Sequence, residues 1–153
     1  MKLRTLIYAI LSLTLGLGAM AQTKHDVVGI WQMVVIDNEG DPSYLPVFKE
    51  IRKDGSFVLF RQTKITKPFR ITQFGTYKML NDSTMREHID QTINTLDLLG
   101  KDSDVTLRFN QDGRILISTF FIPGNPNQFQ EIWVRLALPQ IRKEEQPSNF
   151  STM

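Results

Sequence analysis

Residues 105–122 read VTLRFNQDGRILISTFFI, and this segment gives the clearest indication of the fold class. Its first half alternates apolar and polar residues, so that Val105, Leu107 and Phe109 share one face. Such alternation is typical of a β-strand with one buried side. An Asp-Gly pair at 112–113 separates it from a second apolar run, and this arrangement is a strong indication of a β-hairpin. The stretch therefore predicts two antiparallel strands joined by a tight turn.

The same pattern extends outward in both directions along the chain. We expect eight strands, over residues 28–36, 47–52, 56–62, 69–80, 84–90, 105–109, 114–122 and 129–136. Most connections between them are tight turns, which force neighbouring strands to be antiparallel. Eight such strands in sequence can close into a barrel without exposed edges. The sequence thus predicts an all-β fold, an eight-stranded antiparallel up-and-down barrel.

One segment departs from the strand pattern. In residues 91–102, Ile93, Leu96 and Leu99 are three residues apart, as on one face of a helix, and Gly100 is a residue that often ends one. The sequence therefore allows one short helix around 91–99. A two-sheet sandwich is the alternative to the barrel, and only 37–46 and 91–102 are long enough to supply its crossovers.

The start of the chain has the features of a signal peptide. Lys2 and Arg4 precede the apolar run 6–17, which leads into an Ala-Met-Ala motif of the kind that signal peptidase reads. We expect a Sec-type signal over the first 21 residues, cleaved between Ala21 and Gln22. The run is shorter than a membrane-spanning helix needs. The sequence therefore predicts an exported protein, periplasmic or secreted, without a stable membrane anchor.

Removal of the signal changes the charge of the chain. The whole chain has 18 Lys+Arg and 16 Asp+Glu, but Lys2 and Arg4 leave with the signal, so the mature protein is neutral. A nucleic-acid-binding role thereby loses its main support, which was the basic charge of the whole chain. The absence of Cys excludes disulfides, a Cys-based zinc site, a thiol nucleophile and a lipid attached through Cys.

The remaining chain fits one domain. A length of 153 residues is typical of a single domain, and a hydrophobic content of 41% is too high for a disordered chain. After the signal peptide of residues 1–21, we expect a polar leader over 22–26, the barrel over 27–138 and a flexible, charged tail over 139–153.

The first and last strands carry a resemblance to a known fold family. Gly29-x-Trp31 opens the first strand, and Glu131-x-Trp133-x-Arg135 fills the last. This pairing resembles the calycin superfamily, the lipocalins and their relatives. In that family the glycine permits close approach at the barrel base, the tryptophan closes that end, and an arginine lies over the indole. The resemblance implies that Gly29, Trp31 and Arg135 form a structural clamp.

More closely, the chain resembles a bacterial family of small secreted lipocalin-like domains of unknown function. The phrases that carry this likeness are VGIWQ at 28–32, FKEI at 48–51, GTY at 75–77 and the final E-x-W-x-R. The resemblance covers about residues 27–138. It indicates the fold and says almost nothing about function. The eight strands, the Gly29-x-Trp31 motif and the predicted export together favour a binding protein for a small lipophilic or amphiphilic molecule.

The last strand leaves two arrangements open. Alternation gives it two faces, made of Phe129, Glu131, Trp133 and Arg135 on one side and Ile132, Val134 and Leu136 on the other. With the first face inward, two charges would lie beside two aromatic rings, which suits an amphiphilic ligand. With the second face inward, Glu131 and Trp133 would be outside. For Glu131 the second arrangement is slightly favoured.

Candidate ligand-binding residues are those that a hollow barrel would turn inward: Met33, Leu59, Arg61, Tyr77, Phe129, Glu131 and Trp133. An apolar lining with a few polar groups is typical of a ligand cavity, although a filled core uses the same residue types. Three carboxylates are candidates for the lining of such a cavity: Glu50, Glu87 and Glu131.

Other functions find little support in the sequence. No Ser–His–Asp pattern with a Gly-rich elbow and no metal-binding pair of histidines is present. His88 alternates with Arg86 and Asp90, which predicts a place on the outer face. We expect a monomer that is not an enzyme and has no metal or cofactor. The alternative function is an interaction module with a packed interior that uses its outer surface and loops, such as residues 123–127.

Overall fold

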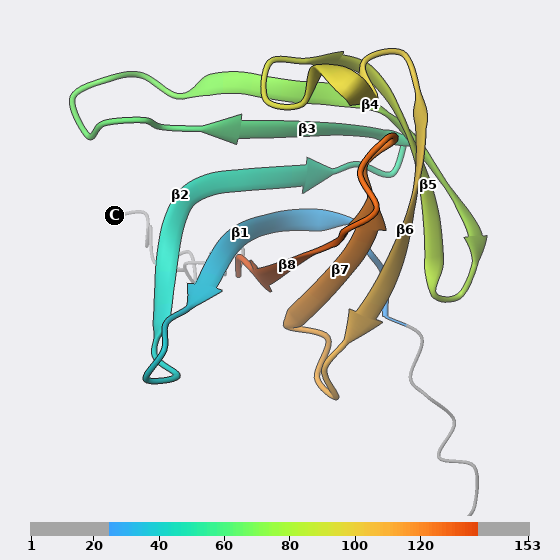
Figure 1. Cartoon of the computed structure of the whole chain (residues 1–153). Coiled ribbons are helices and arrows are strands. Elements are labelled where there is room, and N and C mark those ends of the chain that lie inside the picture. The colour runs from blue at the N-terminus through green and yellow to red at the C-terminus, as the bar shows by residue number, and fades with distance from the viewer. Residues whose placement is uncertain (1–24, 138–153) are drawn as a thin grey trace, which may run out of the picture.

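The strands form a closed barrel in the structure, a computed structural model that describes residues 25–137. Its elements are β1 (Gly29–Ile36), β2 (Pro42–Ile51), β3 (Ser56–Arg61), β4 (Arg70–Asn81), β5 (Thr84–Thr92), η1 (Leu96–Leu98), β6 (Asp102–Phe109), β7 (Ile115–Phe121) and β8 (Gln128–Arg135). Each strand pairs antiparallel with the next one along the chain (Figure 1). The predicted signal peptide of residues 1–21 and the predicted tail of residues 139–153 lie outside the described residues.

The first and last strands close the barrel. β1 pairs antiparallel with β8, with Trp31 opposite Arg135 and Met33 opposite Trp133. Every strand is paired on both sides in one closed ring, so the structure excludes the two-sheet sandwich. The predicted eight-stranded up-and-down barrel is confirmed.

β2 is longer than the sequence indicated. The predicted strand began at residue 47, but β2 begins at Pro42 and pairs with the end of β1, where Pro42 lies opposite Ile36. Pro46 lacks an N–H group, yet its carbonyl still accepts a hydrogen bond from the Gln62 amide at 2.9 Å. The prolines therefore mark a bent strand, visible in Figure 1, instead of a loop.

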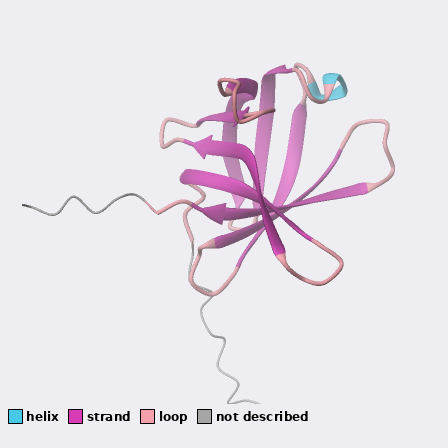
Figure 2. Cartoon of the chain, turned by 90° about the vertical axis from the view of Figure 1, so that its left-hand side faces the viewer, coloured by secondary structure: helices cyan, strands magenta, loops and turns pink. Residues whose placement is uncertain are grey.

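The predicted short helix is reduced to one turn. Within residues 25–137, η1 is the only helical element, a 3₁₀ turn at one end of the strands (Figure 2). β5 and β6 extend into the segment from both sides and leave few residues for a helix. Leu98 is the buried residue of this turn, whereas Ile93, Leu96 and Leu99 are exposed. A short helical turn thus lies within residues 91–99, but the expected apolar face of Ile93, Leu96 and Leu99 is not buried.

The barrel interior is densely packed toward one end. The largest fully buried side chains are Trp31, Trp133, Phe57, Ile51, Met85 and Ile89. The residues around Trp31 leave a void of only about 10 Å³. A void of this size holds one water at most. This packed end, which contains the start of β1 and the end of β8, is called the base below.

Candidate functional site

The base is closed by a tryptophan and an arginine. Trp31 is fully buried, and its indole Nε1 donates a hydrogen bond to the Val27 carbonyl at 2.8 Å. The guanidinium carbon of Arg135 lies 4.2 Å from the centroid of the Trp31 ring, a cation–π contact. A Cβ atom at Gly29 would lie 2.7 Å from Arg135 Nη1, so a larger residue would displace the guanidinium from this position. The predicted clamp of Gly29, Trp31 and Arg135 is present in the structure.

All three nitrogens of the Arg135 guanidinium donate to main-chain carbonyls. Nη1 donates to Val28 at 2.6 Å, Nε donates to Gly113 at 3.3 Å, and Nη2 donates to Asp26. Burial lowers the pKa of Arg135 below its ordinary value, while the nearby Asp26 carboxylate raises it. The charge of Arg135 is thus held by the protein itself, and the base has a structural role.

A cavity of about 110 Å³ occupies the interior beyond the base. Strands β2 to β8 and the segment around η1 all contribute to it. Its lining consists of Lys49, Leu59, Gln73, Glu87, Ile89, Asn94, Thr95, Leu98, Ser103, Val105, Ser118, Phe120, Glu131 and Trp133. Apolar and polar side chains therefore share one small space, which is the candidate functional site.

A buried ion pair forms one side of the cavity. Lys49 Nζ donates a hydrogen bond to Glu87 Oε1, and the two side chains are only 13% and 5% exposed. The Lys49 ammonium also lies 5.0 Å from the centroid of the Phe57 ring. Two charges removed from water need each other, because either one alone would be strongly destabilising.

Glu131 is the third charged group of the cavity. Among the described residues, no Lys, Arg or His lies within ion-pair distance of its carboxylate. Burial raises the pKa of Glu131 above its ordinary value, and the Glu87 carboxylate raises it further. The Lys49 ammonium and, to a smaller extent, the polar groups of Trp133 and Ser118 lower this pKa. Glu131 is therefore a desolvated carboxyl group without a cation of its own.

Trp133 lies at the junction of the base and the cavity. It borders both the small void near Trp31 and the larger cavity. Its indole Nε1 donates a hydrogen bond to Ser118 Oγ at 3.1 Å. The neighbouring strands place Ser118 opposite Glu131, so the hydroxyl, the indole and the carboxyl lie together.

The structure brings three of the seven predicted ligand residues into the cavity: Leu59, Glu131 and Trp133. Glu131 lines the cavity and Trp133 is buried, so the slight preference for an outward Glu131 was wrong. Closure against β1 explains this, because the pairing that puts Arg135 over Trp31 turns every second residue of β8 inward.

The other four predicted residues lie elsewhere. Met33 packs against the core without lining the cavity. Tyr77 lies near the base, where its hydroxyl donates to the Arg52 carbonyl at 2.8 Å. Arg61 is exposed at the end of β3. The Phe129 ring stacks at 5.9 Å on Phe120, and Phe120 is the one of this pair that lines the cavity.

The sequence left several cavity residues unidentified. Lys49 is the most important of these. The sequence does contain a pattern that indicates its inward position, because it shares one face of the strand with the partly buried Val47 and the buried Ile51. Of the three suggested carboxylates, Glu87 and Glu131 meet in the cavity. Glu50 lies outside it, where it accepts a hydrogen bond from Arg52 at 2.7 Å that lowers its pKa.

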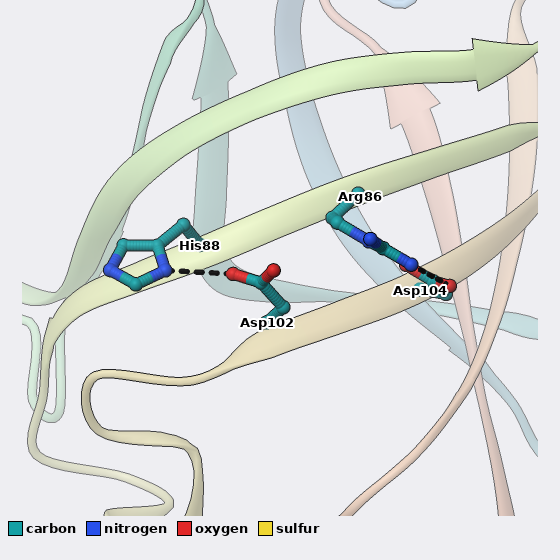
Figure 3. A network of polar contacts seen from close by, with 4 residues as sticks. All are labelled: Arg86, His88, Asp102 and Asp104. Atoms are coloured by element: carbon teal, nitrogen blue, oxygen red, sulfur yellow. Dashed lines mark hydrogen bonds and ion pairs between the residues drawn. The ribbon is translucent and has the colours of Figure 1, made fainter.

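Charged side chains of β5 and β6 form pairs on the outer face (Figure 3). His88 Nδ1 lies 2.8 Å from Asp102 Oδ1, and Arg86 makes two hydrogen bonds to Asp104 at 2.6 and 2.7 Å. The predicted outward position of His88 is confirmed, since its side chain is 45% exposed. In residues 25–137 no three His, Asp or Glu side chains gather as metal ligands. Over the same residues, no helix has the length and hydrophobicity to cross a membrane.

Comparison with known proteins supports one family. The family model described as Domain of unknown function (DUF4488) matches residues 26–146, which include every strand of the barrel. A search of curated proteins found no match.

Proposed function

The chain belongs to the DUF4488 family, and because that family has no assigned function, we propose from the cavity that the protein binds a small amphiphilic molecule. In this proposal the protein is an exported, monomeric, lipocalin-like carrier or sensor that does not transform its ligand. The observation that carries the proposal is the interior cavity, which combines apolar and charged walls in a barrel that is otherwise densely packed.

The cavity volume limits the ligand. Drug-sized ligands occupy pockets of about 300–1,000 Å³, whereas an apolar cavity of about 150 Å³ is known to hold benzene. A cavity of about 110 Å³ therefore suits a molecule of roughly five or six non-hydrogen atoms. A fatty acid or a haem group is too large for this space.

The walls of the cavity favour an amphiphilic ligand over a purely apolar one. Leu59, Ile89 and Phe120 offer apolar contact, while Lys49 and Glu131 offer charged groups. A purely apolar ligand would leave these charges desolvated without new hydrogen bonds, which is unfavourable. The lipocalin-like part of the proposal is supported by the clamp at the base and by closure of the eight strands.

Binding can be tested with straight-chain alcohols from ethanol to octanol. We expect the affinity, followed by tryptophan fluorescence, to rise with chain length up to roughly four or five carbons and then to fall, since longer chains exceed the cavity. Asn94 is exposed and also lines the cavity, so it lies at the mouth. Asn94→Phe should block binding, whereas Ile65→Phe, at an exposed site away from the cavity, should not.

Two outcomes would contradict the proposal. One is a complete lack of saturable binding for every alcohol in the series. The other is equal binding by the protein and by Asn94→Phe, because the alcohols would then occupy a site other than the cavity.

A second function, as an interaction module, is favoured by aromatic residues on the outer face. Phe48 and Phe60 alternate with the inward residues Lys49 and Leu59, so they point outward. The rings of Phe48 and Phe60 stack at 5.6 Å, and Phe69, which is 49% exposed, packs against both. Exposed apolar patches often mark protein contacts.

Self-association would test this second function. If the aromatic patch is a contact surface, sedimentation velocity should show association that increases with concentration and is abolished by Phe69→Ser. Phe121→Ser is the matched control, since Phe121 is exposed to a similar degree at another place. A protein that stays monomeric at all concentrations would count against association with itself.

A further inference from the structure

We infer that the cavity binds a small primary amine in its cationic form, with Glu131 as the counter-ion, because the cavity holds two carboxylates and one ammonium, and that ammonium already binds Glu87. This inference rests on the proposed function and identifies the chemical class of the ligand.

The first argument is the charge count. The charged residues of the lining are Lys49, Glu87 and Glu131. Lys49 donates directly to Glu87, so these two charges neutralise each other. Glu131 remains as the unmatched charge. A cationic ligand would complete a neutral set, whereas an anionic ligand would add a second unmatched negative charge.

The second argument is the surroundings of Glu131. Ser118 lies opposite Glu131 on the neighbouring strand, and its hydroxyl accepts a hydrogen bond from the Trp133 indole, so the polar neighbours of the Glu131 carboxyl group on this side are uncharged. The pKa of Glu131 is raised mainly by burial, which shows that the empty cavity penalises the charged form. A bound cation would remove this penalty, since an opposite charge at short distance favours the ionised carboxylate.

The third argument is the fit of an ammonium group to the rest of the lining. A primary ammonium has three N–H donors, of which Glu131 can accept one or two. The Ser103 hydroxyl and the Gln73 amide provide further acceptors within the same lining. Trp133 and Phe120 provide aromatic rings, which attract cations through their faces. The apolar side chains leave room for a short hydrocarbon tail.

The other reading of Glu131 is a protonated acid that donates a hydrogen bond to a neutral ligand. The two readings predict opposite ligand preferences. Butylammonium, 1-butanol and butyrate have nearly the same size and differ in charge, so they discriminate between a cationic, a neutral and an anionic ligand. All three are small enough for the cavity.

The two tryptophans of the chain provide a reporter and an internal control. The Trp133 indole N–H lies at the cavity, whereas the Trp31 indole N–H donates to Val27 in the base. In ¹H–¹⁵N spectra of the ¹⁵N-labelled protein, a ligand in the cavity should shift the Trp133 indole signal and leave that of Trp31 nearly unchanged. Trp133→Phe would assign the two signals.

We expect butylammonium to bind roughly tenfold or more tightly than 1-butanol, and butyrate to bind most weakly, as for a hydrogen bond between charged groups in a desolvated site. Glu131→Gln, which keeps the shape and removes the charge, should weaken butylammonium binding by roughly 10- to 100-fold. Glu50→Gln is the matched control, because Glu50 lies outside the cavity and should leave the affinity unchanged.

The outcomes separate this inference from the proposed function. If 1-butanol binds as tightly as butylammonium, or butyrate binds most tightly, the cavity is a binding site and the amine inference is wrong. If none of the three probes shifts the Trp133 signal, the proposed function fails as well. Equal butylammonium binding by Glu131→Gln would also overturn the inference.

Discussion

The two ends of the barrel interior each hold a desolvated charge, but they treat it differently. At the base, Arg135 donates to three main-chain carbonyls and lies on the Trp31 ring, and the interior around that ring has almost no empty space. In the cavity, Glu131 has uncharged polar neighbours, no cation of its own and about 110 Å³ of space beside it. A charge that the protein satisfies by itself stabilises the fold. A charge left beside open space is available to a ligand.

The comparison explains why similar residue types have different roles in one barrel. Both ends contain a buried tryptophan next to a charged residue of β8. The difference lies in the neighbours, since the base is completed by the chain before β1 and the cavity is bordered by polar side chains such as Lys49 and Glu87. The base is therefore expected to tolerate substitution poorly, and the cavity to tolerate it where charges remain balanced.

The largest expected effect is at the base. Trp31→Ala should lower the free energy of unfolding by about 3–5 kcal/mol, as for other buried large aromatic residues. The substitution also removes the ring on which Arg135 lies. Urea denaturation followed by circular dichroism would measure the loss. Ile65→Ala is the control, since Ile65 is 92% exposed and should change stability little. A Trp31→Ala protein as stable as this control would mean that the base does not hold the barrel together.

The next effect concerns the ion pair of the cavity. Lys49→Met should lower the free energy of unfolding by about 3 kcal/mol, because it leaves Glu87 buried without a partner. The double variant Lys49→Met/Glu87→Leu should recover most of this loss, since it removes both charges. A double-mutant cycle in urea would test this. A double variant that is less stable than Lys49→Met would show that the pair has a stabilising role beyond neutralising two charges.

The sequence predicted the fold better than the site, for a physical reason. Alternation and turn residues are local, so segments such as 105–122 indicate their own structure. The predicted strand bounds were wrong where local sequence and strand pairing disagree. At Pro42 the local residues favour a turn, but β1 provides a pairing partner, so the strand begins there. The helix expected at 91–99 is shorter than its apolar spacing indicated, because strand pairing extends β5 to Thr92.

The site depends on contacts between residues distant in sequence. Lys49 and Glu87 are 38 residues apart, and only the register of four strands brings them together. Alternation in β8 defines two faces without determining which one is inward. That choice is made by pairing with β1, which places Arg135 at Trp31 and consequently Glu131 in the cavity. The residues of the proposed binding site are thus the ones that local patterns identify least well.

A pH dependence of stability would sharpen the contrast between Glu131 and an ordinary carboxylate. The folded protein holds the Glu131 proton more tightly than the unfolded chain does, because burial raises its folded pKa. Between the ordinary value of 4.5 and the raised value, unfolding releases this proton, so its contribution makes stability fall as pH rises. Above the raised pKa, the contribution of Glu131 to the stability of the fold is constant and unfavourable.

Glu131→Gln should remove this fall and make the protein more stable than the parent at neutral pH. Thermal unfolding between pH 4 and pH 8 would measure the difference. Glu50→Gln is a control of opposite sign, because the Arg52 hydrogen bond lowers the pKa of Glu50 and its contribution is lost as pH falls. A constant difference between Glu131→Gln and the parent across this range would contradict the desolvation of Glu131.

The smallest expected effect is on the outer face, where charges are paired but neither buried nor close to the cavity. Asp104→Asn removes the partner of Arg86 (Figure 3), and both side chains are exposed to water. Water and salt screen such pairs, so the melting temperature should change by roughly 1 °C or less, and by less still in 0.5 M salt. Butylammonium binding should be unchanged, because this pair does not line the cavity. A loss of stability as large as that caused by Lys49→Met would mean that burial does not determine how much a charged pair of this protein contributes to stability. The contrast between base and cavity would then need another cause.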